Sequence, residues 1–329
     1  MVHDDRLTAL TRFAETALGT RALAITPASS DASFRRYFRI RAGDASWIGM
    51  DAPPGREDLG PFIRIARRFG ALGLHVPDVL TADTEAGFAL LTDLGDRPYL
   101  GELNERTADR LYGDALGALI VLQGGAFAEP DFLPPYDAAR LRQEMELFPE
   151  WYLERYLGYR MTADDRGLLE TCFASLVAAA QAQPQLWVHR DYHSRNLLVS
   201  ERHNPGILDF QDAVLGPITY DLVSLLKDCY IAWPRARVVD WVRGYAELSR
   251  ESGLHRCEDD ALFVEWFDRM GIQRHIKVAG IFARLHLRDG KPGYLRDIPL
   301  TMRYLQDTTA LYPDLEGLNR FLTALPSAP

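Results

Sequence analysis

The stretch His189-Arg190-Asp191-Tyr192-His193-Ser194-Arg195-Asn196, followed by Ile207-Leu208-Asp209-Phe210, decides the fold expected of this chain. An Asn stands five residues after the first Asp, and a second Asp stands eighteen residues after it. Apolar residues follow the Asn and precede the second Asp, and Asn204-Pro205-Gly206 between them has turn composition, so a β-hairpin is predicted. In an antiparallel pair, the start of one strand lies beside the end of the other. Asn196 and Asp209 are therefore predicted to meet, with Asp191 on the loop that leads into the hairpin.

These three polar side chains suit phosphate transfer. The oxygens of an Asn and an Asp side by side are hard ligands, which favour Mg²⁺ carrying nucleotide phosphates. A third carboxylate that is not needed as a ligand can orient and deprotonate an attacking hydroxyl. The sequence thus predicts Asn196 and Asp209 as metal ligands and Asp191 as the catalytic base.

The same spacing resembles the catalytic loop and the metal-binding Asp of the protein-kinase-like fold. Asp-Phe-Gln-Asp at 209–212, in place of Asp-Phe-Gly, is similar to the aminoglycoside phosphotransferase and choline kinase branch, which phosphorylates small molecules. The resemblance implies ATP and Mg²⁺ as cofactors and an α+β fold with two lobes. The expected parts are a small antiparallel β N-lobe (1–93, with a helix at 57–70), a hinge (94–97), and a larger, mostly helical C-lobe (98–329) with a catalytic loop (189–196) and a metal loop (207–212).

The composition is that of an ordinary globular protein, with 329 residues of which 47% are hydrophobic and 25% charged. The net charge of −9 argues against a nucleic-acid partner. No continuous apolar run approaches the roughly 18 residues of a membrane span, and the first residues lack the pattern of a secretion signal. Three widely spaced cysteines favour reduced thiols. A cytoplasmic monomer without membrane or nucleic-acid partners is therefore expected.

The segment 22–50 has the pattern of strands separated by short turns, with strand-like runs at 22–26, 34–40 and 46–50. The loop between the first two runs is rich in serine, whereas kinase-like folds usually have glycines there. Serine hydroxyls and backbone N–H groups can still bind phosphate oxygens, so Ser30 and Ser33 are predicted nucleotide contacts.

The resembled fold carries a Lys on its third strand that binds the α- and β-phosphates. Here that strand ends in Met50-Asp51, and no Lys precedes Lys227. Either phosphate affinity rests mainly on the metal, or the cation is an Arg of the preceding strand, namely Arg35, Arg36 or Arg39. Arg36 is taken as the candidate, although the residues alone leave the choice open. Glu57 and Asp58 are interpreted as acids favoured by the dipole of the helix that follows, not as partners of that cation.

A fully apolar strand is predicted at 88–92, followed by a break at Asp93. In the resembled family this junction is the hinge, whose backbone hydrogen-bonds the edge of adenine. By position, the resemblance assigns nucleotide contacts to Leu91, Thr92 and Leu94. Another strand is predicted at 76–80.

After Pro98 the pattern becomes helical, with helices predicted at 107–123, 137–157, 163–180, 234–250, 259–287 and 316–324. Gly124-Gly125 is expected to end the first, and Pro149 to interrupt the second. The aromatic residues at that interruption, Trp151 and Tyr152, are interpreted either as core or as a platform for a sugar ring. The basic stretch that begins at Arg284 is interpreted as a solvated surface or as one wall of the site for an anionic acceptor.

The remaining loop residues receive roles from the resemblance. Arg195 is assigned to the charge of the transferred phosphoryl group, because Arg is cationic at every working pH. Acceptor contacts are assigned to His193, Gln211 and Asp212, and supporting roles behind the catalytic loop to His189 and Asp221.

More narrowly, Ser-Asp-Ala-Ser-Phe-Arg-Arg-Tyr-Phe-Arg, Met-Asp-Ala-Pro-Pro and Leu-Thr-Asp-Leu-Gly-Asp are similar to the anomeric sugar kinases of bacterial cell-wall recycling. These enzymes phosphorylate the C1 hydroxyl of N-acetylmuramate and N-acetylglucosamine, so an amino-sugar acceptor is the expectation that this resemblance implies. Two alternatives stay open: another hydroxyl acceptor (an aminoglycoside, choline or a homoserine-like alcohol), or a nucleotide-binding pseudokinase scaffold.

Overall fold

The computed structural model describes residues 4–21, 23–30 and 34–326. The chain divides into two compact units, Met1–Asp114 with Arg195–Asp212 and Ala115–Ser194 with Ala213–Pro329. We call them the N-terminal unit and the helical unit and describe each by itself. The predicted hairpin with Asn196 and Asp209 belongs to the first, and Asp191 belongs to the second. The lobe and hinge boundaries expected from the sequence stay a prediction.

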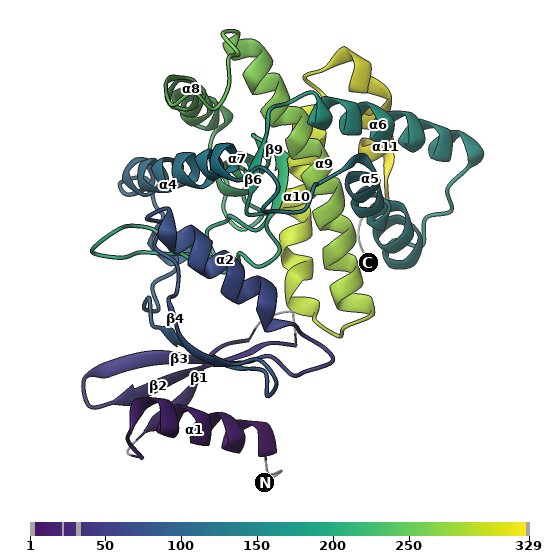
Figure 1. The fold of residues 1–329 in the computed structure, drawn as a ribbon. Helices are drawn as coiled ribbons and strands as arrows, with labels where there is room; N and C mark the ends of the chain where they lie inside the picture. Colours follow the sequence, from purple (N-terminus) through teal and green to yellow (C-terminus); the bar gives the residue numbers. More distant parts are fainter. Residues whose placement is uncertain (1–3, 22, 31–33, 327–329) are drawn as a thin grey trace. The chain divides into compact units, whose positions relative to one another are not determined.

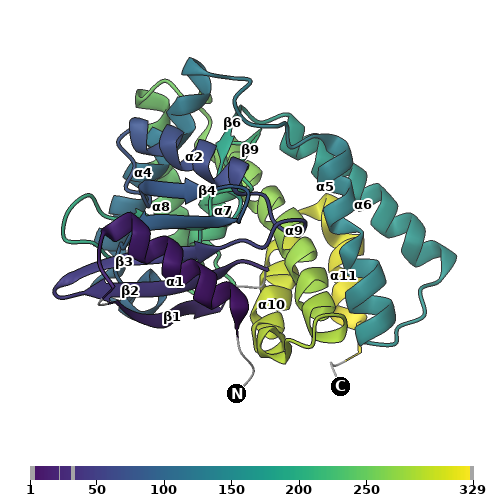
Figure 2. The ribbon, with the colours of Figure 1, turned by 60° about the horizontal axis from the view of Figure 1, so that its bottom comes forward.

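The N-terminal unit is built on an antiparallel sheet with the strand order β1-β2-β3-β5-β4. Its strands are β1 (Ala24–Ser30), β2 (Arg36–Ala42), β3 (Ala45–Asp51), β4 (Val79–Asp83) and β5 (Phe88–Thr92). Helix α1 (Asp5–Leu18) lies along one face of the sheet (Figures 1 and 2). Alternate residues of β2 point to that face, where Phe38 packs with Leu10 and Ile40 packs with Ala14. Arg36 has the same parity as Phe38 and Ile40 and so belongs to the same face. Arg35 comes one residue earlier, before the strand begins.

Helix α2 (Leu59–Ala71) confirms the helix predicted in this unit. It begins after Asp58, whose side chain caps it by accepting a hydrogen bond from the Gly60 N–H at 2.8 Å. Strand β4 begins at Val79, later than predicted, because its pairing with β5 starts at Val79 and Leu91, after Pro77, which has no N–H to donate.

The predicted hairpin is confirmed as β7 (Leu197–Leu198) and β8 (Gly206–Ile207), paired antiparallel. Backbone hydrogen bonds tie it to the N-terminal unit, since the N–H of Val199 donates to the carbonyl of Arg97 and that of Ile207 to the carbonyl of His75, both at 2.8 Å. The short helix α3 (Tyr99–Glu102) follows Pro98, which bridges Leu198.

The helical unit contains a two-stranded antiparallel sheet of β6 (Gln185–Val188) and β9 (Val214–Pro217), surrounded by helices. Its longest helix, α9 (Asp260–Leu287), lies beside α10 in both views (Figures 1 and 2). The other helical elements of this unit are α5 (Ala138–Met145), a π-helix (Phe148–Tyr156), α6 (Ala163–Gln181), α7 (Tyr220–Leu226), α8 (Arg235–Glu251), a 3₁₀ turn (Pro292–Asp297), α10 (Ile298–Thr309), a second 3₁₀ turn (Pro313–Leu315) and α11 (Glu316–Ala324).

The end of one helix was predicted wrongly, and one helix was not predicted. Helix α4 (Ala108–Ala128) continues through Gly124-Gly125, because buried contacts such as the hydrogen bond from Gln123 Nε2 to the carbonyl of Ile218 (2.8 Å) hold this segment in the helix. Helix α10 was not predicted, although its buried Ile298, Met302 and Leu305 have helical spacing. By length and composition alone α4 is apolar enough to cross a membrane, but half of the tested window is buried in the protein.

Candidate active site

One group of predicted site residues is the pair Asn196 and Asp209 in the N-terminal unit. As predicted from the hairpin, the two side chains meet: Asn196 Nδ2 donates to Asp209 Oδ2 at 3.4 Å. The other carboxylate oxygen of Asp209 accepts a hydrogen bond from Gln211 Nε2 at 2.7 Å. Asp209 has a positive φ of 63°, a left-handed conformation that Asp tolerates better than most residues. The backbone is thus bent at the residue that presents the carboxylate.

Packing holds this bend in place. The ring of Phe210 is buried and stacks on Phe62 of α2, with a centroid distance of 5.0 Å, and also contacts Phe69 at 5.8 Å. A buried aromatic residue next in the chain to Asp209 therefore anchors the carboxylate to helix α2. This packing explains why an apolar residue follows the Asp.

The pair fits a magnesium ion that also binds nucleotide phosphates. Mg²⁺ is usually held by one or two carboxylates together with phosphate oxygens and waters, not by a closed cage of protein ligands. Within the described ranges no group of three or more His, Cys, Asp or Glu side chains is arranged to hold a metal ion. One carboxylate and one amide are the ligands expected of an ion shared with a nucleotide. Gln211 Oε1, which is buried and lacks a hydrogen-bond partner in the described part of the chain, is a further oxygen beside them.

A separate group of predicted site residues is the loop with Asp191 in the helical unit. The buried carboxylate of Asp221 accepts hydrogen bonds from the N–H groups of His189 (2.6 Å) and Arg190 (3.0 Å). Arg190 has a positive φ of 78°, which is strained for a residue with a long side chain, and these bonds hold it there. Burial raises the pKa of Asp221 to about 7, although both N–H groups oppose the rise. Asp221 thus supports the loop backbone, as the resemblance implied.

Other buried groups fix the rest of the loop. Asp228 accepts a hydrogen bond from the N–H of Ser194 at 2.9 Å and another from its hydroxyl. The Tyr192 hydroxyl donates to the carbonyl of Ala115 at 2.8 Å, and the N–H of His193 donates to the carbonyl of Asp191 at 3.0 Å. The loop is therefore held on both sides of the predicted base.

Asp191 lines a hollow of about 90 Å³ within the helical unit. Burial would raise the pKa of Asp191, but the positive charges of Lys277, His193, Arg190 and Arg274 outweigh burial and lower it below the ordinary value. The carboxylate is therefore ionised at neutral pH, the state that can accept a proton. The hollow is lined by charged residues beside an apolar wall: Asp191, His193, Tyr220, Asp228, Cys229, Tyr230, Arg274, Lys277, Val278, Ile281 and Phe282.

Of the predicted acceptor residues, His193 lines this hollow, and its ring packs edge-on against Tyr230 at 5.4 Å. Tyr152 is a buried core residue stacked on Phe148 at 5.2 Å, and the ring of Trp151 is covered by the Arg155 guanidinium at 4.0 Å. Neither aromatic residue lines the hollow, nor does Arg284 near the end of α9, whose pKa is lowered by burial.

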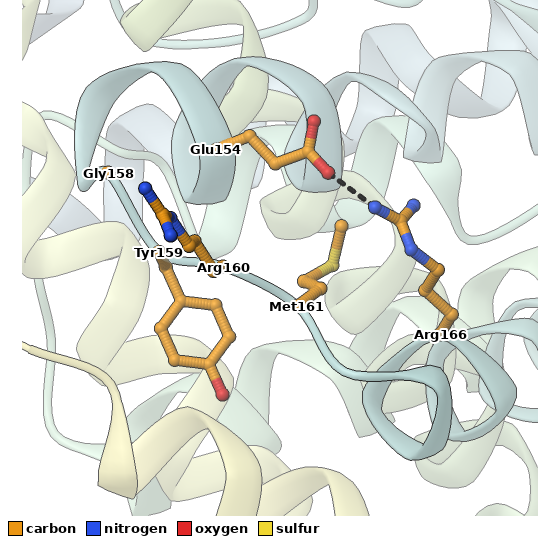
Figure 3. A pocket seen from close by; sticks show the side chains of 6 residues that line it. All are labelled: Glu154, Gly158, Tyr159, Arg160, Met161 and Arg166. Atoms are coloured by element: carbon orange, nitrogen blue, oxygen red, sulfur yellow. Dashed lines mark hydrogen bonds and ion pairs between the residues drawn. The ribbon is translucent and has the colours of Figure 1, made fainter.

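The chain also has a larger hollow of about 350 Å³ between the π-helix and α6 (Figure 3). An ion pair of 2.6 Å between Glu154 and Arg166 joins two of its walls, and Gly158, Tyr159, Arg160 and Met161 complete the lining. None of the predicted site residues lines it, so we do not connect it with the chemistry.

The three arginines considered as phosphate ligands lie in different surroundings. Arg36 donates to the fully buried carboxylate of Asp51 at 2.5 and 2.9 Å and to Asp4 at 2.5 Å. Arg39 makes ion pairs with Asp93 (2.7 Å) and Asp96 (3.2 Å).

Arg35 makes an ion pair of 3.6 Å with Glu57, just before α2, and both side chains are largely buried. The structure thus places Arg36, the predicted candidate, in a cluster on the sheet face that α1 covers, and it joins Arg35 to the acid for which the sequence gave only a helix-dipole role.

The other predicted nucleotide contacts belong to the N-terminal unit, and the structure describes only some of their side chains. Ser33 lies outside the described residues, and Ser30 ends β1 without a described side chain. The N–H of Thr92 donates to the carbonyl of Asp78 at 3.0 Å, and Leu91 is a buried strand residue. Leu94 is partly buried, as is Arg195, and Asp212 is exposed.

The sequence analysis missed the polar residues that face Asp191. Lys277 Nζ contacts Glu144 Oε2 at 3.0 Å and donates to the Tyr220 hydroxyl at 2.9 Å, and Arg190 Nη2 contacts the same Glu144 at 2.5 Å. Burial would lower the pKa of Lys277, but Tyr220 and Glu144 raise it above the ordinary value. The available signal was the cluster Arg274-His275-Ile276-Lys277 directly before the apolar run 278–283, in a chain with three lysines.

The chain matches the model of the phosphotransferase enzyme family over residues 24–259, and it belongs to that family. It is therefore an enzyme that transfers phosphate to an acceptor group, and the sequence prediction of a kinase is confirmed. Among curated relatives, the N-acetylmuramate/N-acetylglucosamine kinase of Pseudomonas aeruginosa is 47% identical over 302 residues, covering 92% of this chain and 88% of the relative. The protein of the same name from Neisseria meningitidis is 41% identical over 321 residues, covering 96% and 95%.

Solved structures show the same fold at low sequence identity. The GDP complex of aminoglycoside 2′-phosphotransferase-IIIa has a TM-score of 0.62 and 14% identity, with 94% of this chain and 99% of that chain covered. Choline kinase from Cryptosporidium parvum has a TM-score of 0.63 and 10% identity, with 96% and 99% covered. The kinase-like α+β fold expected from the sequence is thus confirmed.

Proposed function

We propose that this enzyme is a cytoplasmic, monomeric sugar kinase that transfers the γ-phosphoryl group of ATP to the C1 hydroxyl of N-acetylmuramate and N-acetylglucosamine. The observation that carries the acceptor assignment is the identity of 41–47% with kinases of that name over most of the chain. A role in peptidoglycan recycling follows from these acceptors.

In this proposal Asp191 accepts the proton of the sugar hydroxyl while that oxygen attacks the γ-phosphorus in line. Two observations support this role of Asp191. Its carboxylate has a lowered pKa and lines a hollow, and its loop is supported by hydrogen bonds to Asp221 and Asp228. Asn196 and Asp209 hold Mg²⁺, which when bound neutralises charge on the phosphates. Arg195, four residues after the base, contributes positive charge toward the transferred group.

We assign the phosphate-binding cation of the N-terminal unit to Arg35. A kinase-like site places a cation against an acid of the helix that follows the third strand, and the ion pair of Arg35 with Glu57 before α2 has this arrangement. Arg36 and Arg39 are already bound by two acids each. Arg binds phosphate through two donors, so it can replace Lys in this role.

The experiment is a panel of acceptors with ATP and Mg²⁺: N-acetylmuramate, N-acetylglucosamine, an aminoglycoside, choline and homoserine. We expect sugar 1-phosphates, identified by ³¹P NMR, from the first two. Consumption of ATP with another acceptor only would replace the acceptor assignment. Binding of ATP without turnover of any acceptor would favour a scaffold.

Variants of the acids test the mechanism. Asp191→Asn should lower kcat by about 10²–10⁴-fold while ATP still binds, because a general base contributes this much. Asp209→Asn should abolish metal-dependent turnover. Asp240→Asn, at an exposed position of α8, is the matched control and should leave activity unchanged. Full activity of Asp191→Asn would refute the assignment of the base.

A further inference from the structure

The hollow beside Asp191 contains a buried guanidinium whose donors are little used. Arg274 on α9 is 5% exposed, and its hydrogen bond within the described part of the chain runs from Nη1 to Cys229 Sγ at 3.8 Å. Sulfur is a weak acceptor, so this contact satisfies little of a group with five N–H donors. A buried polar group of this kind is normally hydrogen-bonded, which points to an oxygen supplied by a ligand.

The other charged groups that line the hollow have partners. Lys277 contacts Glu144 and Tyr220, and Asp228 accepts hydrogen bonds from Ser194 and from the N–H of Tyr230 at 3.1 Å. The lining has two carboxylates, Asp191 and Asp228, and three cationic groups, His193, Arg274 and Lys277. Because Lys277 is already paired with Glu144, the other two cations balance the two carboxylates. A neutral ligand oxygen keeps this balance, whereas a ligand carboxylate would add an uncompensated buried charge.

The volume and lining of the hollow further limit which chemical group can bind there. The volume of about 90 Å³ is well below the roughly 300–1,000 Å³ of a pocket that encloses a whole small molecule, so the hollow holds one substituent. Arg274 supplies donors to the lining, and Val278, Ile281 and Phe282, which follow it on the same face of α9, supply apolar surface. Because the predicted base also lines it, the substituent must be next to the hydroxyl that reacts. For transfer to C1, that neighbour is the group on C2.

We propose that this hollow, which we name the acyl hollow, holds the 2-acetamido group of the sugar, with Arg274 donating to the carbonyl oxygen and Val278, Ile281 and Phe282 contacting the methyl group. The inference rests on the proposed transfer to C1. It makes the acetamido group, which both amino sugars share, the feature that the helical unit recognises. The 3-lactyl carboxylate of N-acetylmuramate lies outside the hollow.

The size of the acyl hollow is tested with N-acetylglucosamine and N-propanoylglucosamine. The wild-type enzyme should prefer the acetyl compound by about 10–100-fold in kcat/KM, because one extra methylene group does not fit. Val278→Ala removes wall atoms and should bring this ratio close to one. Val242→Ala, the same change at a buried position of α8 that does not line the hollow, is the matched control and should keep the wild-type ratio. An equal ratio in the two variants would overturn the proposal.

The role of Arg274 is tested by Arg274→Lys, which keeps the charge and loses the paired donors. KM should rise by about 10–100-fold for N-acetylglucosamine and by the same factor for N-acetylmuramate, while KM for ATP stays constant. Arg269→Lys, on the same helix and outside the hollow, is the control, and thermal unfolding of both variants shows that each is folded.

A much larger rise for N-acetylmuramate alone would mean that Arg274 binds the lactyl carboxylate, and a fall in kcat with constant KM values would mean that it only positions the loop. Either result overturns the proposal. If the wild-type enzyme phosphorylates neither amino sugar, the proposed function itself is refuted.

Discussion

Arg35 and Arg36 are neighbours in the chain, yet their replacement by alanine should impair different properties. Arg36 donates to Asp51, whose carboxylate is fully buried and also accepts from Arg6 at 2.5 and 2.8 Å. Breaking a buried ion pair costs about 3–5 kcal/mol when the remaining charge is left alone, and a hydrogen bond to a charged group contributes about 1.5–3 kcal/mol. Arg6 still neutralises Asp51 in Arg36→Ala, so the cost of the substitution falls in the range for a lost hydrogen bond to a charged group. Arg36→Ala should therefore lower the free energy of unfolding by about 2 kcal/mol and Tm by about 3 °C.

Arg35→Ala should have little effect on stability. Its ion pair with Glu57 is 3.6 Å long, which is too long for a hydrogen bond, and Glu57 keeps the hydrogen bond that it accepts from the Phe34 N–H at 3.1 Å. We therefore expect the loss of Arg35 to cost only about 1 kcal/mol. The loss of a charge-assisted contact to a phosphate should instead raise KM for ATP by about 10–100-fold.

The two variants are compared by thermal unfolding and by steady-state kinetics at varied ATP. A third readout is the rise in Tm with added nucleotide, which depends on binding and not on turnover. It should persist in Arg36→Ala and become small in Arg35→Ala. A raised KM for ATP in Arg36→Ala, with an unchanged KM in Arg35→Ala, would refute the assignment of the cation.

Four further variants test the packing and charges of the helical unit. Because the pKa of Asp221 is about 7 in the folded protein and 3.8 in a free side chain, the folded state binds more protons between these values, so stability present at low pH is lost as pH rises toward 7. Denaturant unfolding at pH 5, 6 and 7 should show this loss, on the order of 2 kcal/mol, in the wild type and not in Asp221→Asn; parallel curves would contradict the shift. Gly280→Ala should destabilise by about 2–4 kcal/mol, since its Cβ would lie 2.4 Å from the backbone of Leu147, whereas Gly244→Ala has open space and should stabilise by about 0.5–1 kcal/mol. Asp268→Ala leaves buried Lys227 without its carboxylate and should cost about 3–5 kcal/mol in the same assay; a loss below about 1 kcal/mol would show that this ion pair is dispensable.

The hairpin and its pair of polar side chains were predictable from the sequence. Turn composition and short apolar runs set the register locally, so Asn196 and Asp209 had to meet wherever the hairpin packed. The helices α6, α9 and α11 were predictable for the same reason, because the spacing of apolar residues within one helix is a local property.

The choice of the arginine that we propose as the phosphate-binding cation could not be made from the sequence. Arg35, Arg36 and Arg39 have the same chemistry, and what separates them is the face of the sheet and the acid that each one meets. Glu57 is brought to Arg35 by tertiary packing across 22 positions of the chain, whereas Asp51 is the cross-strand neighbour of Arg36 in the β2–β3 pair. The end of helix α4 could not be predicted from the sequence either. The helix continues through Gly124-Gly125 because buried contacts outweigh the low helix propensity of glycine.

The sequence by itself predicted the groups that we propose as base and metal ligands of this phosphotransferase, and most of the strands and helices that carry them. Only the tertiary structure decided what surrounds them, because Arg274 and Lys277 on α9 reach the hollow of Asp191 from more than 80 residues further along the chain. A motif is a local pattern in the chain, whereas the wall of a pocket is made by side chains that meet only after folding.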